Sequence, residues 1–117
     1  MKEGAIINRD EVSISFIKSY LKSIKKHISN DNFTVANREK NKNFMREYGL
    51  DINDLKDVML SLTPNDCISN CESDYNGYPG MVYKFKSNYI EELIIYIKTR
   101  YNPPDEVILI SFHEDEL

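Results

Sequence analysis

Side chains able to bind a phosphate and to transfer a proton alternate with apolar residues in the C-terminal third of the chain. Tyr96, Lys98 and Arg100 recur at every second position, and His113 ends the apolar run VILISF. Lysine and arginine bind phosphate groups and stabilise the charge that develops on them. Histidine can move a proton near neutral pH, and tyrosine can stack on a base. This combination is suited to phosphodiester chemistry.

Three predicted strands carry these residues, at 81–87, 92–100 and 106–112. The connections between them are short enough for antiparallel hairpins, so we expect a three-stranded meander. Side chains alternate between the two faces of a strand, and the apolar set of each strand should face the protein core. The residues then expected together on the open face are Tyr96, Lys98, Arg100, His113, Lys84 and Lys86.

In the last strand, strict alternation directs Ile108, Ile110 and Phe112 one way, and Leu109, Ser111 and His113 the other. The sequence does not fix the pairing register, so His113 could lie level with Tyr96 or two residues away. A solvated sheet face explains the same pattern, because lysine, arginine and tyrosine are common on such faces.

Helical periodicity precedes the meander. A first amphipathic helix is expected at 11–29, with Asp10 as its N-cap. Its apolar stripe comprises Val12, Phe16, Ile17, Tyr20, Leu21, Ile24 and Ile28. A short strand follows at 33–35, and a second helix is expected at 38–48. We expect Asn37 to cap that helix, which should bury Phe44, Met45 and Tyr48 and end at Gly49.

A third helix should begin after Asp51 or Asn53 and end before Pro64. The segment 63–80 consists almost entirely of turn-forming residues. The order of elements predicts one α+β domain over residues 1–117, with about three helices on one face of a mainly antiparallel sheet that ends in the meander.

The composition restricts the partners. No apolar stretch approaches the ~20 residues that span a bilayer, and MKEGAIINRDE has no signal-like apolar segment, so we expect a cytoplasmic protein without membrane contact. We expect Cys67 and Cys71 to be reduced loop thiols and not metal ligands, because no second Cys/His pair is present. No cofactor is indicated.

Charge is unevenly distributed along a chain of net charge −4. Residues 16–46 contain eight Lys or Arg and two Asp or Glu, whereas residues 102–117 contain five Asp or Glu and no Lys or Arg. This asymmetry permits a basic surface for an anionic ligand. Arg38 and Lys42 begin the second helix, where free backbone N–H groups also favour a phosphate, although a solvated helix face is the simpler interpretation.

Four segments together resemble the MqsR-type toxins of bacterial toxin–antitoxin pairs. They are REKNKNFMREYGLDINDLKDVMLSLTPND, YPGMVYKFKS, IIYIKTRY and VILISFHED, and the resemblance covers about residues 33–115. It implies a RelE-like fold and a metal-independent mRNA endonuclease that inhibits translation, with the ribosome as a further candidate partner. It also implies neutralisation by an antitoxin, expected to be a helix-turn-helix protein encoded by the adjacent gene.

The resemblance also implies site residues. The family associates activity with a lysine after the third helix, a glutamine before the meander, a Y-x-K tyrosine and the residue after S-F. Tyr96 matches the tyrosine, with Lys98 completing Y-x-K, and His113 follows Ser111-Phe112 where well-known relatives carry lysine. Residues 66–69 contain no lysine, and Gly80 stands about where the glutamine would be.

Three hypotheses follow. The first is a ribonuclease toxin in which His113, Tyr96 and Lys98 act in catalysis, and the RNA-binding residues are Arg100, Lys84, Lys86, Arg38 and Lys42. The second is an RNA- or ribosome-binding module of the same fold without catalysis. The third is a protein-interaction domain whose acidic C-terminal tail binds a basic partner.

Overall fold

The computed structural model describes residues 11–73 and 76–116 as an α+β structure in which helices pack against a five-stranded mixed sheet. The elements are α1 Glu11–Ser29, β1 Thr34–Val35, α2 Glu39–Glu47, α3 Ile52–Ser61, the 3₁₀ helix η1 Pro64–Asp66, β2 Glu72–Ser73, β3 Met81–Ser87, β4 Ile95–Asn102 and β5 Glu106–Glu114. The α+β class and the β3–β4–β5 meander predicted from the sequence are confirmed.

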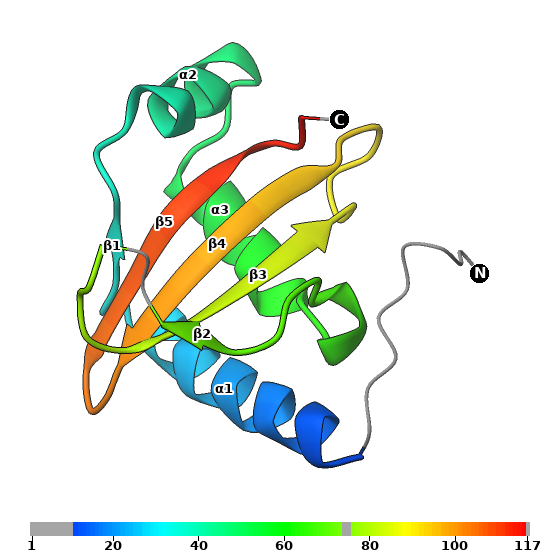
Figure 1. Ribbon diagram of the computed structural model, residues 1–117. Coiled ribbons are helices and arrows are strands. Elements are labelled where there is room, and N and C mark those ends of the chain that lie inside the picture. Colours follow the sequence, from blue (N-terminus) through cyan, green and yellow to red (C-terminus); the bar gives the residue numbers. More distant parts are fainter. Residues whose placement is uncertain (1–10, 74–75, 117) are drawn as a thin grey trace.

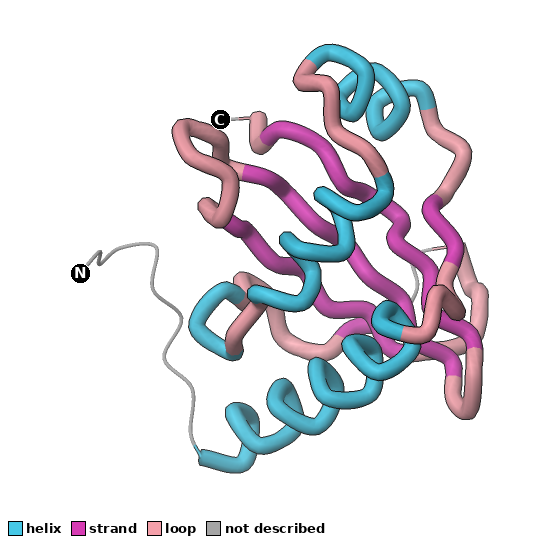
Figure 2. The backbone as a smooth tube through the Cα atoms, turned by 180° about the vertical axis from the view of Figure 1, so that it is seen from behind, coloured by secondary structure: helices cyan, strands magenta, loops and turns pink. Residues whose placement is uncertain are grey.

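The strand order is β1-β5-β4-β3-β2, with all neighbours antiparallel except β1 and β5, which are parallel. Helices α1 and α3 cover one face of this sheet (Figure 2), whereas α2 lies beside β5, beyond the end of the short edge strand β1 (Figure 1). The opposite face, which Figure 1 presents to the reader, has no helix across it. We call it the open face.

The core lies between α1, α3 and the sheet. Ile95 and Ile97 of β4 and Phe85 of β3 are fully buried there, as the alternation of apolar residues predicts. The apolar residues that α1 and α3 bury against them are Ile17, Tyr20, Leu21, Ile24, Ile28, Leu55, Val58 and Met59. Val12 and Phe16 were expected in the same stripe, but they are 60% and 63% exposed, and Phe16 lines an open pocket with Tyr83 and Tyr101 and is not enclosed in the core.

The ends of the helices differ in part from expectation. Asp51 caps α3 through a reciprocal capping box with Asp54, which decides between the two candidate caps. The N-cap of α2 is Arg38 and not Asn37, and its side chain makes no capping hydrogen bond. Tyr48, expected to be buried, is 39% exposed and donates a hydrogen bond to Glu114. The proposed cap Asp10 lies outside the described residues.

Candidate active site

Three cross-strand rows define the open face, because directly paired residues of an antiparallel sheet project to the same side. The rows are Lys86–Tyr96–His113, Lys84–Lys98–Ser111 and Val82–Arg100–Ile108. The register therefore places His113 level with Tyr96. All six residues that were expected on this face occupy it.

A β-bulge in β5 corrects one part of the sequence analysis. Lys98 pairs with Ser111 and Thr99 with Leu109, so Ile110 is an extra residue without a partner on β4. Strict alternation assigned Leu109 to the face of His113, but Leu109 is completely buried in the core. The extra residue reverses the alternation, which lets Leu109 and Phe112 both face the core while Ser111 and His113 face outward.

Asn41 of α2 holds this bulge in place, a role that the sequence analysis did not predict. The residue is 2% exposed, and its Nδ2 donates to the carbonyl oxygens of Ile110 and Ala36, both at 3.1 Å. Its Oδ1 accepts the backbone N–H of Phe112 at 3.0 Å. The amide thus replaces a neighbouring strand where β1 has already ended, and it anchors the backbone on both sides of Ser111.

His113 is 8% exposed and lies beside Tyr96, with 5.5 Å between the ring centroids. Its Nδ1 is 3.0 Å from the backbone carbonyl oxygen of Glu114. A carbonyl oxygen can only accept, so Nδ1 must carry the proton of this hydrogen bond. In the neutral ring, Nε2 is then left with its lone pair.

Two cations near His113, one on β4 and one at the start of α2, are not neutralised by a carboxylate. The ammonium group of Lys98 makes no ion pair or hydrogen bond within residues 11–73 and 76–116. Arg38 donates from Nη1 to Ser111 Oγ at 3.0 Å and to the Ile110 carbonyl at 3.3 Å, both neutral acceptors. A shallow pocket of about 360 Å³ brings them together with the imidazole; its lining is Arg38, Lys40, Tyr96, Lys98, Ser111, His113 and Glu116.

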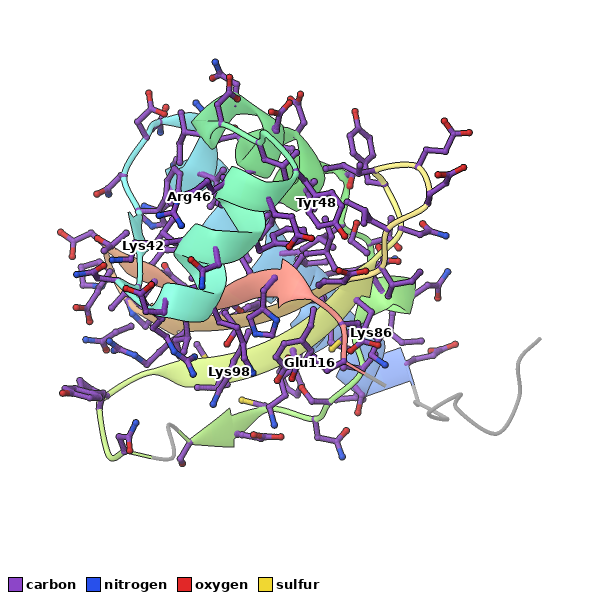
Figure 3. All side chains as sticks on the ribbon, turned by 90° about the horizontal axis from the view of Figure 1, so that it is seen from above. Lys42, Arg46, Tyr48, Lys86, Lys98 and Glu116 are labelled. Carbon is purple, nitrogen blue, oxygen red and sulfur yellow. The ribbon has the colours of Figure 1, made fainter. Side chains whose placement is uncertain are left out.

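The remaining lysines around this pocket are paired. Lys86 lies 3.0 Å from Asp115, Lys84 lies 3.4 Å from Glu72, and Lys40 lies 3.1 Å from Glu116. In Figure 3, Lys86, Lys98 and Glu116 occur on the same side of the sheet. The acidic tail expected from the sequence therefore lies beside the candidate site and lowers its positive charge. Lys40 is a pocket residue that the sequence analysis missed, because its proximity depends on how α2 docks on β5, whereas Ser111 was expected on the face of His113 but was given no role there.

Arg100 and Lys42 differ from the arrangement expected of phosphate-binding residues. Arg100 points to the open face but is 5% exposed, and its Nη1 donates to the carbonyl of Pro79 at 2.6 Å and to Glu106 at 3.2 Å. Lys42 pairs with Glu39 and lines a different pocket, between α2 and α3, away from Lys98 (Figure 3). The structure does not bring Lys42 to the site.

Ser69 and Gly80, which lie in the two regions where the resemblance led us to expect a lysine and a glutamine, have structural roles. The hydroxyl of Ser69 accepts the backbone N–H of Lys84 at 2.9 Å, and the residue is 8% exposed. Gly80 has φ +121°, and a Cβ there would lie 2.7 Å from the carbonyl oxygen of Tyr101. Only glycine fits this close approach of two backbones, so a side chain cannot be supplied from residue 80 in this conformation.

Both cysteines are free thiols, Cys67 buried and Cys71 exposed. Among the described residues, His, Cys, Asp and Glu do not gather in groups of three or more that could hold a metal ion.

In the described part of the chain, no helix is long and apolar enough to cross a membrane. Comparisons of the sequence with protein-family models and curated proteins, and of the structure with solved structures, find no significant match.

Proposed function

We propose that this protein is a metal-independent endoribonuclease that acts on mRNA at the open face. The observation that carries the proposal is the convergence of His113, Tyr96, Lys98 and Arg38 on one pocket, with the two cations free of carboxylates. These groups supply what phosphodiester cleavage needs, namely a proton acceptor and positive charge for the phosphate.

The reaction would be an attack of the RNA 2′-hydroxyl oxygen on the adjacent phosphorus. The 2′-O–P bond forms and the P–O5′ bond breaks, leaving a cyclic phosphate and a 5′-hydroxyl. The proton of the 2′-hydroxyl is taken up and another is delivered to the leaving O5′ atom, so a single imidazole or an imidazole with water can serve both steps. Only RNA can react in this way, because DNA lacks the 2′-hydroxyl.

His113 is suited to be the group that takes the proton. The hydrogen bond from Nδ1 to the Glu114 carbonyl leaves the Nε2 lone pair of the neutral ring available as a base. The same hydrogen bond stabilises the cation after the proton has been accepted, because the carbonyl is an acceptor in both states. Tyr96, beside the ring, would position the nucleotide.

Lys98 and Arg38 would bind the non-bridging phosphate oxygens. Charge on these oxygens increases in the transition state, and prearranged cations stabilise it. The Arg38 guanidinium is held by Ser111 and the Ile110 carbonyl, so its position is set before the substrate arrives. Lys84, Lys86 and Lys40 are paired with carboxylates and would act more weakly, by attracting RNA to the surface.

The test is cleavage of single-stranded RNA by the purified protein in the presence of EDTA. Replacing His113 by alanine should slow cleavage by ~100-fold or more. The matched control is His27→Ala, because His27 is the chain's other histidine and lies on α1, behind the sheet. Equal loss of activity in the two variants, or no loss in either, would remove His113 from the mechanism.

The biological role we propose is that of a toxin in a toxin–antitoxin pair, acting on mRNA in the cytoplasm, with or without the ribosome. The support is the sequence resemblance over about residues 33–115 together with the α+β fold. Expression alone should arrest growth, and co-expression of an antitoxin, expected as a helix-turn-helix protein from the adjacent gene, should restore it. Growth without arrest would refute the toxin assignment.

A second candidate is an RNA-binding module without catalysis. It is favoured by residues 66–69, which contain no lysine, and by Gly80, which stands about where the resemblance implies a glutamine. Such a module would retard RNA in a salt-dependent way without shortening it. The EDTA experiment separates the two candidates, because only the first gives shorter RNA.

A further inference from the structure

At the far end of the open face from His113, an aromatic ring covers a buried cation. The guanidinium of Arg100 lies under the ring of Tyr78, with 5.4 Å between Cζ and the ring centroid. Arg100 is 5% exposed, whereas Tyr78 is 61% exposed. One face of the ring is therefore occupied by Arg100 while most of the residue is in contact with solvent.

The chain around Tyr78 is held at several points. The Pro79 carbonyl accepts from Arg100 at 2.6 Å, and Glu106 fixes the same guanidinium from β5 at 3.2 Å. Gly80 brings the backbone against Tyr101 so closely that a Cβ would lie 2.7 Å from its carbonyl oxygen. The backbone that follows Tyr78 is thus held and one face of its ring lies against Arg100 before any ligand binds, which lowers the entropy cost of binding.

The location relates Tyr78 to the cation of the proposed active site. Arg100 and Lys98 are two residues apart on β4 and point to the same side, so their Cα atoms are about 7 Å apart along the strand. A single-stranded RNA whose phosphate is bound at Lys98 would pass close to the exposed side of the Tyr78 ring.

We propose that Tyr78, supported by Arg100, is a stacking platform for an unpaired nucleobase next to the phosphate that is cleaved. This inference rests on the proposed ribonuclease function and adds a base-binding subsite to it. Stacking on an aromatic ring accepts every base, because every base has a π face. The platform would strengthen binding and fix the register of the strand, and it would select single-stranded RNA over paired RNA.

The experiment measures the affinity of a labelled single-stranded RNA oligonucleotide by fluorescence anisotropy. All proteins carry His113→Ala, so that cleavage is too slow to disturb the binding measurement. Adding Tyr78→Ala should weaken binding by about 5- to 150-fold, the range found when a stacked base loses its aromatic partner. Tyr78→Phe should bind like the parent. The matched control is Tyr89→Ala, since Tyr89 is 57% exposed but lies in the loop between β3 and β4.

An abasic oligonucleotide, with the sugar-phosphate chain intact, separates stacking from an indirect structural effect. Tyr78→Ala should leave the affinity for abasic RNA unchanged, because that RNA has no base to stack. If Tyr78→Ala instead weakens abasic and normal RNA equally, the ring only protects the Arg100–Glu106 ion pair and the platform is refuted.

The same titrations distinguish failure of the platform from failure of the proposed function. If the parent binds RNA, Lys98→Ala weakens binding and Tyr78→Ala does not, the platform is wrong and the phosphate site stands. If the parent does not bind RNA, both proposals are overturned.

Discussion

Replacing Asn41 by alanine removes three hydrogen bonds from the junction of α2 and β5. Two of them, to the Ile110 carbonyl and from the Phe112 N–H, are with the backbone at the β-bulge. The Ile110 carbonyl keeps a second donor in Arg38, but the buried N–H of Phe112 loses the acceptor that Asn41 supplies. Leaving one buried donor unsatisfied costs about 1–3 kcal/mol.

We therefore expect Asn41→Ala to lower the free energy of unfolding by about 2 kcal/mol. With a urea m-value of about 2 kcal/mol/M, typical of a small protein, the unfolding midpoint should fall by about 1 M. Urea denaturation followed by circular dichroism measures this shift. Because the bulge directs Ser111 and His113 to the open face, RNA cleavage by the folded variant should fall as well.

Asn43→Ala is the matched control for this prediction. Asn43 lies on the same helix, is exposed, and its side chain accepts a hydrogen bond from Arg46 at 2.9 Å. Surface substitutions of this kind change stability by no more than about 0.5 kcal/mol. If Asn41→Ala unfolds at the same urea concentration as Asn43→Ala, the amide does not hold the bulge and the reasoning is refuted.

Three further predictions concern charge and pH. Glu116→Gln should strengthen RNA binding by up to about fivefold at low salt, because it removes a carboxylate that pairs with Lys40 at the pocket; anisotropy titration measures this. Lys98→Ala should weaken RNA binding and reduce the slope of log affinity against log salt by about 1. Burial raises the pKa of the Tyr20 phenol above its usual value of 10, so above about pH 10 this phenol ionises in the unfolded state before it does in the folded state. The wild type therefore loses stability as the pH rises, and Tyr20→Phe should lose less. Urea titrations between pH 8 and pH 11 follow this loss.

Each of these predictions has a matched control. Glu47→Gln neutralises an exposed carboxylate at the C-terminus of α2 and should change RNA affinity less than Glu116→Gln does. If Glu116→Gln binds RNA more weakly than the wild type, the Glu116 carboxylate does not oppose RNA binding at the pocket. Lys18→Ala removes an exposed charge from α1, behind the sheet, and an equal change in salt slope would mean that RNA is not bound on the open face. Tyr89→Phe should leave the alkaline stability profile as it is in the wild type, and an identical profile for Tyr20→Phe would show that Tyr20 does not cause the loss.

Local patterns were sufficient to predict the elements that form the core and the open face. The alternation through Ile95, Tyr96, Ile97 and Lys98 assigned both faces of β4 correctly, because each apolar side chain must be removed from water. The start of α3 at Asp51, one of two candidate caps, and the positive φ of Gly49 also agree with residue chemistry that acts within a few positions.

The bulge at Ile110 could not be predicted, because it depends on residues distant in sequence. With strict alternation, Ile108, Ile110 and Phe112 would face the core, and all three are apolar. The sequence therefore carries no local sign that Ile110 is an extra residue. The bulge becomes favourable only when Asn41, about seventy residues earlier, supplies partners for the backbone.

Which cations of the open face are paired with carboxylates also depends on tertiary structure. Arg100, Lys84 and Lys86 were expected to bind phosphate because of their residue type and face. The structure pairs them with Glu106, Glu72 and Asp115, which come from three different segments. Sequence periodicity identifies which side chains share a face, but the carboxylates that approach them are determined by how loops and the C-terminal tail fold over that face.

The most direct measurement of the proposed function is mass spectrometry of RNA after incubation with the purified protein in EDTA. We expect fragments that end in a 2′,3′-cyclic phosphate and begin with a 5′-hydroxyl, formed by the wild type and by His27→Ala and strongly reduced with His113→Ala. A 2′-O-methyl RNA of the same sequence should remain intact, because its 2′ oxygen cannot attack. Intact RNA with the wild type, or fragments that begin with a 5′-phosphate, would contradict cleavage by this site.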